Sequence, residues 1–171
     1  GIGSRFWPMS TTDYPKQFID VLGCGRTLIQ LTKDRFEGIC PPENIWVVTS
    51  EKYAEEVKRQ LPEIADDHIL REPCRRNTAP CIAYVSWKIK ARDPKANMVV
   101  TPSDHIIMDV KEFQRVIKSS LKFTNNSDAI LTLGMTPTRP ETGYGYIEAD
   151  LSYPSNYNKE VYRVDSFKEK P

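Results

Sequence analysis

The strongest constraint on the fold of this chain is an alternation of short, β-branched apolar runs with amphipathic segments of helix length. Strand-like runs at 45–49 and 68–71 flank a segment of helical periodicity, and further strand-like runs lie at 98–101 and 129–133. A strand, a helix and another strand in succession usually pair as parallel neighbours covered by the helix. We therefore predict an α/β fold with a mixed, mainly parallel sheet flanked by helices.

Three capping signals mark where helices begin. Thr27 with Gln30, and Asp109 with Glu112, have the spacing of a capping box, in which the two side chains and the backbone amides satisfy one another. Asn77 precedes a segment with a proline in its first turn and is expected to cap a third helix.

Beyond residue 133 the helical periodicity stops, and proline, glycine and tyrosine become frequent. We expect a loop here, followed by extended segments at 144–148 and 161–164. The whole range 1–171 is expected to be one partial domain, with 134–171 as a ligand-facing subregion. The first and last residues both look like cuts within a longer domain.

Composition excludes several classes of protein. The 24 lysines and arginines nearly balance the 23 aspartates and glutamates, so the chain lacks the basic field typical of nucleic-acid or membrane-surface binding. No apolar run approaches the roughly 20 residues that span a bilayer, and no signal peptide opens the chain. We expect a cytoplasmic protein whose four cysteines are reduced and small buried side chains.

The first candidate site is a phosphate-binding turn. Glycines allow backbone amides to approach phosphate oxygens, an arginine supplies several donors, and a lysine a short loop later supplies a point charge. The residues of this predicted site are Gly1, Gly3, Ser4, Arg5 and Lys16. Taken alone, such glycines are more often an ordinary tight turn and such a lysine is more often solvated.

The second candidate site is a polar loop that leads into a helix start, where donors and acceptors can meet the edge of a nucleotide base. It consists of Arg76, Asn77, Thr78, Ala79 and Pro80. The alternative is that Asn77 only caps its helix, and the two roles are compatible.

Asp104 is the candidate metal ligand. It follows the strand-like run at 98–101, and open α/β sheets bind ligands beyond the carboxyl ends of their strands. Magnesium is usually held by one or two carboxylates together with substrate phosphates and water. The alternative is an ordinary turn residue, and the neighbouring His105 is interpreted as structural.

The segment 137–147 combines glycines with aromatic and polar groups, a composition suited to a hydroxyl-rich sugar. A carboxylate near the end of the chain can accept hydrogen bonds from sugar hydroxyls, and the ammonium beside it can meet a phosphate. The candidate sugar-phosphate residues are Gly143, Tyr144, Gly145, Glu169 and Lys170. A surface β-hairpin and a solvated charge pair are the alternatives.

Read in order, these motifs resemble the sugar-phosphate nucleotidyltransferases, and among them the mannose-1-phosphate guanylyltransferases of the bacterial long-chain type. The matching segments span the chain: the opening GIGSRFWPMS, PKQF at 15–18, RNTAP at 76–80, TPSDH at 101–105, PTRPETGYGYI at 137–147 and FKEKP at 167–171. The resemblance implies a Rossmann-like sheet of the nucleotide-diphospho-sugar transferase type, with 1–133 mainly binding the nucleotide and 134–171 mainly binding the sugar phosphate.

The resemblance also implies a reaction: GMP transfer from GTP to mannose 1-phosphate, giving GDP-mannose for polysaccharide biosynthesis, with Mg²⁺ on Asp104. Arg5, Lys16 and Asp104 would be catalytic. Family members take a second metal-binding aspartate from sequence beyond FxEKP, so we expect this chain alone to turn over poorly.

Three alternatives stay open at this point. One is the same chemistry with another nucleotide or hexose 1-phosphate, which the run 76–80 disfavours, and another is a non-catalytic regulatory relative that binds a sugar nucleotide. The third is a parent protein that also carries an isomerase module. A homo-oligomer is compatible with the sequence.

Overall fold

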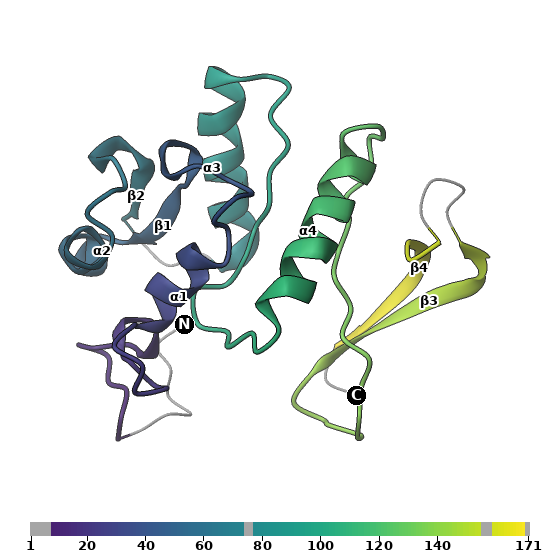
Figure 1. Cartoon of the computed structure of the whole chain (residues 1–171), viewed down its shortest axis with the longest axis horizontal. Helices are drawn as coiled ribbons and strands as arrows, with labels where there is room; N and C mark the ends of the chain where they lie inside the picture. Colours follow the sequence, from purple (N-terminus) through teal and green to yellow (C-terminus); the bar gives the residue numbers. More distant parts are fainter. Residues whose placement is uncertain (1–7, 74–76, 155–158, 170–171) are drawn as a thin grey trace. The chain divides into compact units, whose positions relative to one another are not determined.

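The computed structural model describes residues 8–73, 77–154 and 159–169 (Figure 1). The chain divides into two compact units, Gly1–Lys118 and Ser119–Pro171. The expected division at residue 133 separates a nucleotide-binding part from a sugar-phosphate-binding part. The division into compact units does not test it, so it stays a prediction.

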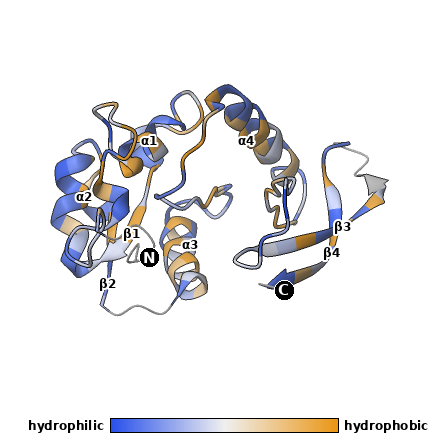
Figure 2. Cartoon of the chain, turned by 90° about the horizontal axis from the view of Figure 1, so that it is seen from below, coloured by the Kyte–Doolittle hydropathy of each residue, from blue (hydrophilic) through white to orange (hydrophobic). Residues whose placement is uncertain are grey.

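The first unit is built on a parallel strand pair. Strand β1 (Val47–Ser50) pairs with β2 (Ile69–Glu72) in a register that sets Val47 opposite Ile69. Helix α2 (Ala54–Gln60) lies between them in the sequence, as the alternating pattern predicts. Figure 2 colours β1 as largely hydrophobic and most of α2 as hydrophilic, which is the pattern of a strand covered by an amphipathic helix. The prediction of an α/β fold with parallel pairing is confirmed.

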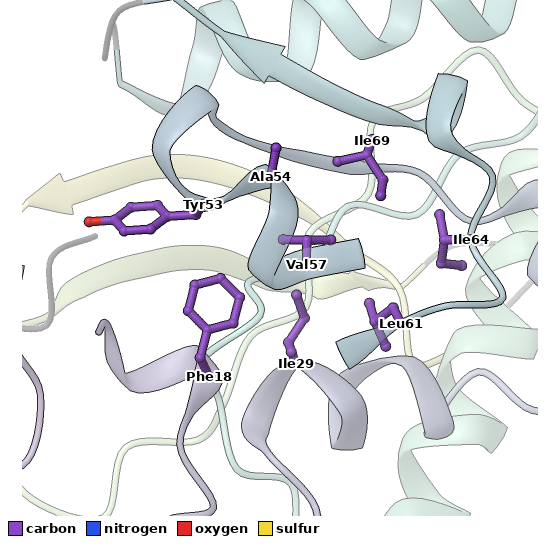
Figure 3. Packing of buried hydrophobic residues seen from close by; sticks show 8 residues of the cluster. All are labelled: Phe18, Ile29, Tyr53, Ala54, Val57, Leu61, Ile64 and Ile69. Carbon is purple, nitrogen blue, oxygen red and sulfur yellow. The ribbon is translucent and has the colours of Figure 1, made fainter. Parts of the chain in front are cut away.

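A hydrophobic cluster joins α2 and β2 to the N-terminal elements (Figure 3). Helix α1 (Leu28–Asp34) supplies Ile29, and the short 3-10 turn η2 (Lys16–Phe18) supplies Phe18, which is 2% exposed. The cluster comprises Phe18, Ile29, Tyr53, Ala54, Val57, Leu61, Ile64 and Ile69. Each large side chain buried in this way contributes about 1.5–3 kcal/mol, so the cluster fixes the position of η2.

The predicted helix starts are found. The Thr27 N–H donates to the Gln30 side chain (3.0 Å) at α1, and the Glu112 N–H donates to the Asp109 carboxylate (2.9 Å) at α4 (Val110–Thr124). Asn77 precedes α3 (Thr78–Arg92), but its side chain makes no capping hydrogen bond. The predicted cap position is therefore correct, and the predicted cap bond is not made.

Two predicted strands do not form within the described residues. The runs at 98–101 and 129–133 are extended without a paired neighbour, since the sheets found there are β1–β2 and β3–β4. Most of their apolar side chains are exposed, with Val100 at 52% and Ile130 fully accessible. A β-branched run becomes a strand only when an adjacent strand satisfies its backbone, and no such partner is found here.

The second unit contains an antiparallel hairpin of β3 (Gly145–Pro154) and β4 (Tyr162–Glu169). The expected extended segments at 144–148 and 161–164 are confirmed, and both strands run further than predicted. Register shifts occur after Glu148 and after Asp150. Lys168 pairs with Glu148 across the ladder at 3.0 Å.

The described cysteines, Cys24, Cys40 and Cys81, are free thiols, as predicted. They are not the buried side chains expected, because Cys24 is exposed and the other two are only partly covered. Cys74 lies outside the described residues. Among those residues no helix has both the length and the hydrophobicity needed to cross a bilayer.

Candidate functional site

The structure describes ten of the predicted site residues. These are Lys16, Asn77, Thr78, Ala79, Pro80, Asp104, Gly143, Tyr144, Gly145 and Glu169. The other six, Gly1, Gly3, Ser4, Arg5, Arg76 and Lys170, lie outside the described residues.

In the first unit, the predicted phosphate-binding lysine meets the predicted metal ligand. Lys16 Nζ lies 3.0 Å from Asp104 Oδ2, although the two residues are far apart in the sequence. Both side chains remain partly accessible, at 19% and 31%. Because neither side chain is fully covered, a phosphate or a cation can reach either partner.

The position of Lys16 follows from its neighbours. Pro15 and Phe18 are fully buried on either side of it. The Tyr14 hydroxyl and the Gln60 side-chain amide both donate to the Phe18 carbonyl, at 3.0 and 3.1 Å. These contacts fix the turn, so the ammonium projects from a rigid support rather than from a free loop.

Asp104 suits a cation that arrives with phosphate oxygens. The described residues contain no group of three or more metal-ligating side chains, so they form no closed protein cage. Asp104 Oδ2 faces Lys16, and Oδ1 lies 3.8 Å from the His105 Nε2. A single accessible carboxylate is the donor set of a hard cation whose remaining ligands are phosphates and water.

Asn77 has an unusual backbone conformation. Its φ is 67° with ψ near −172°, and it is the one described non-glycine residue with positive φ. This region favours glycine and costs an asparagine about 1–3 kcal/mol. Strain of this kind at an exposed helix start is often found at ligand sites, and the side chain is not used for capping. Thr78, Ala79 and Pro80 follow it and are exposed.

In the second unit, Gly145 lies directly opposite Glu169 in the hairpin register. A Cβ added at Gly145 would stand 2.8 Å from Glu169 Oε2, so any side chain at that position would displace the carboxylate. The glycine therefore leaves space for the carboxylate above the strand. Sequence motifs alone do not predict this pairing, because it depends on the hairpin register.

The loop before β3 is ordered by a residue to which the sequence reasoning gave no role. Glu141 Oε1 accepts a hydrogen bond from the Gly143 N–H (3.2 Å), and the Tyr146 hydroxyl donates to the Glu141 carbonyl (3.0 Å). These bonds hold the turn from which Tyr144, 59% exposed, projects. The signal was a carboxylate two residues before a glycine, a spacing that allows a side chain to accept from the backbone.

Comparison with known proteins assigns the chain to a family. The model of the nucleotidyl transferase family matches residues 1–171. The chain belongs to this family. The parallel pair and Asp104 thus lie within the part of the chain that matches the nucleotidyl transferase family.

Two curated relatives align over the whole chain. It is 39% identical to mannose-1-phosphate guanylyltransferase 2 of Escherichia coli O157:H7 over 178 residues, covering 100% of this chain and 36% of that protein. It is 38% identical to the alginate biosynthesis protein AlgA of Pseudomonas aeruginosa, covering 100% and 35%. The chain therefore spans about a third of the length of these relatives.

A solved structure supports the fold of this nucleotidyl transferase. The chain superimposes on mannose-1-phosphate geranyltransferase from Thermus thermophilus with a TM-score of 0.85 at 30% identity, covering 100% of this chain and 48% of the other.

Proposed function

We propose that this chain is the nucleotidyl-transfer part of an enzyme that transfers GMP from GTP to mannose 1-phosphate, producing GDP-mannose and pyrophosphate. The observation that carries the proposal is the pair of Lys16 and Asp104, which supplies an ammonium for phosphates and a carboxylate for a cation at one place. The choice of GTP and mannose 1-phosphate is supported by the relatives described as mannose-1-phosphate guanylyltransferases.

In the proposed reaction, a phosphate oxygen of mannose 1-phosphate attacks the α-phosphorus of GTP. A new P–O bond forms there, the bond from the α-phosphorus to the α–β bridging oxygen breaks, and its electron pair leaves with pyrophosphate. The attacking phosphate is already ionised near neutral pH, so the protein needs no general base. Its contribution is to position two anions and to neutralise their charge.

Lys16 would move from Asp104 to the GTP phosphates, with Gly1, Gly3, Ser4 and Arg5 as the other proposed phosphate ligands. Asp104 would then be free to hold a divalent cation, proposed to be Mg²⁺, which when bound lowers the charge of the triphosphate. The partial accessibility of both side chains supports this exchange, because incoming ligands can reach them.

Asn77 is the proposed contact to the guanine edge, because its side chain is exposed and spared from capping. Arg76, Thr78, Ala79 and Pro80 would complete this base site. An amide side chain carries both a donor and an acceptor, which matches the mixed edge of guanine.

Gly145, with Gly143 and Tyr144, is the proposed backbone surface for mannose. Glu169 would accept from the sugar hydroxyls, and Lys170 would meet the sugar phosphate. The proposal thus gives residues 1–133 mainly to the nucleotide and 134–171 mainly to the sugar phosphate, in a cytoplasmic enzyme.

The test is pyrophosphate release by the full-length protein with Mg²⁺, pairing GTP, dTTP and UTP with mannose 1-phosphate and glucose 1-phosphate. Preference for GTP with mannose 1-phosphate is expected. Preference for another pair would refute the proposed specificity. Nucleotide binding without pyrophosphate release from any pair would refute the proposed catalysis and support a regulatory role.

A further inference from the structure

A cavity of about 160 Å³ lies in the first unit, lined by α1, the segment around residues 105–107 and the start of α4. Leu31, Ile106, Ile107 and Val110 give it an apolar lining. Arg35, at the end of α1, contributes the buried charge. The proposed transfer reaction uses none of these residues.

Arg35 lacks the acidic partner that a buried arginine usually has. Its side chain is almost completely covered, with the residue 4% exposed. One guanidinium nitrogen donates to the Thr32 hydroxyl at 2.6 Å, while the buried Nε has no hydrogen-bond partner. Among the described residues no carboxylate lies within ion-pair distance of Arg35. Burial accordingly lowers the pKa of this guanidinium, since water no longer solvates the charge.

The guanidinium of Arg35 also lies over an aromatic ring. It lies 5.4 Å from the centre of the Phe113 ring, which itself packs edge-on against Phe36. A cation over an aromatic face gains about 0.5–2 kcal/mol, well below the cost of burying an unpaired charge. An anion in the cavity would compensate the charge of Arg35.

Asp34 also lines the cavity, but its charge is already compensated. It forms a bidentate pair with Arg26, at 2.7 Å for the shorter contacts, and Lys33 lies 3.7 Å away. The excess charge at the cavity therefore comes from Arg35 and is positive.

We propose that this cavity binds a small monocarboxylate with an apolar body, whose carboxylate pairs with Arg35 and whose hydrocarbon part contacts the apolar lining. The volume corresponds to about five water molecules at roughly 30 Å³ each, which suits a ligand of about seven non-hydrogen atoms. A single negative charge is favoured over a phosphate dianion, because Arg35 supplies one uncompensated positive charge and the apolar lining offers a second negative charge no partner.

The cavity is open to such a ligand from outside. His105 is 62% exposed on its side chain, and Leu22 is 49% exposed at the same site. A ligand can therefore enter without unfolding of α1 or α4.

The test is a titration of the full-length protein with isovalerate, followed by ligand-observed NMR and by thermal unfolding. We expect saturable binding with a Kd on the order of 1 mM, the affinity that about seven non-hydrogen atoms provide at modest ligand efficiency. Isovaleramide, which has the same shape without the charge, is expected to bind at least about tenfold more weakly.

Two variants test the assignment to this cavity. Arg35→Met keeps the apolar stem and removes the guanidinium, so isovalerate binding should fall at least about tenfold. Ile106→Phe keeps Arg35 and narrows the cavity, so it should also weaken isovalerate binding. If Arg35→Met does not fold, this variant alone tests whether isovalerate binds in the cavity. Arg59→Met, which removes an exposed arginine on α2, is the control and should bind as the unchanged protein does.

Several outcomes would overturn the proposal. These are no saturable binding up to about 20 mM, far above the expected Kd, equal binding of acid and amide, and binding unaffected in the folded variants. Inorganic phosphate that binds more tightly than isovalerate, and that loses this binding in Arg35→Met, would also reject the assignment to a monocarboxylate. None of these measurements depends on nucleotidyl transfer, so this proposal and the proposed function can fail separately.

Discussion

Replacing Gly145 with alanine should damage sugar-phosphate use without damaging the fold. The new Cβ would stand 2.8 Å from Glu169 Oε2, and ordinary contact begins at 3.4 Å, so the carboxylate must withdraw by about 0.6 Å. The atom that moves is the end of a flexible side chain, which makes the adjustment cheap for folding. Because alanine costs a strand less entropy than glycine, the melting temperature should hold or rise slightly.

The effect on substrate follows from the displaced carboxylate. A hydrogen bond to a charged group contributes about 1.5–3 kcal/mol, and a factor of ten corresponds to about 1.4 kcal/mol. Loss of one such bond to a mannose hydroxyl should therefore raise the KM for mannose 1-phosphate by about 10-fold to 100-fold, with the KM for GTP little changed. Steady-state pyrophosphate release by the full-length protein measures both constants.

Gly134→Ala is a matched control, because its new Cβ would lie 3.8 Å from the Ile147 Cδ1, an ordinary contact. A double-mutant cycle with Glu169→Ala gives the decisive comparison. If Gly145→Ala acts through Glu169, it should add little in the Glu169→Ala background. Two results would refute the reasoning. One is that Gly145→Ala raises the KM as much in the Glu169→Ala background as in the unchanged protein, and the other is that Gly145→Ala and Gly134→Ala have equal KM values for mannose 1-phosphate.

Three other predictions concern the first unit. Lys16→Ala should lower kcat by about 100-fold to 1,000-fold, as loss of one preorganised electrostatic contact does, while Lys58→Ala, which removes an exposed ion pair with Asp66, should leave kcat within threefold in the same assay. Asn77→Gly should raise the free energy of unfolding by about 1 kcal/mol through relief of backbone strain, yet reduce the preference for GTP over UTP; an unchanged preference would remove Asn77 from base recognition. The hydrogen bond from Arg59 holds the pKa of Glu56 below its ordinary value, with those from Gln60 and Tyr14 assisting against burial. A depressed folded-state pKa gives stability that is present above the unfolded pKa and is lost as pH falls through the folded value, so chemical denaturation between pH 7 and pH 3 should show a shallower loss for Glu56→Gln.

Local signals predicted the helices and the first strand pair because those signals act over short distances. The capping box of Thr27 and Gln30 satisfies its own donors, and the pattern around 53–61 places its apolar residues on one helical face. The runs at 98–101 and 129–133 have the same apolar character but depend on a paired neighbour, which local sequence does not specify. Strand propensity therefore predicted β1 and β2 correctly, because the two pair with each other, and it was wrong for the two runs without a paired neighbour among the described residues.

The candidate site shows the same division. Lys16 was predicted as a phosphate ligand and Asp104 as a metal ligand, each from residue type and position in the sequence. Their roles stay predictions, and the 3.0 Å contact between them was not foreseen. The positive φ of Asn77 was not predictable, because nothing in an asparagine requires that conformation. The opposition of Gly145 and Glu169 depends on register, and the uncompensated charge of Arg35 depends on packing against Phe113.

The register of the hairpin also limits how this region can change length during evolution. Side chains alternate between the two faces of a strand, so a slip of one residue in β4 would turn Glu169 to the opposite face from the one Gly145 leaves open. Insertions between the two motifs are compatible with this arrangement only if the connecting segment absorbs them, because any shift of β4 would move Glu169 away from Gly145. Homologous sequences should therefore differ freely in the spacing between these motifs while keeping a glycine opposite the glutamate.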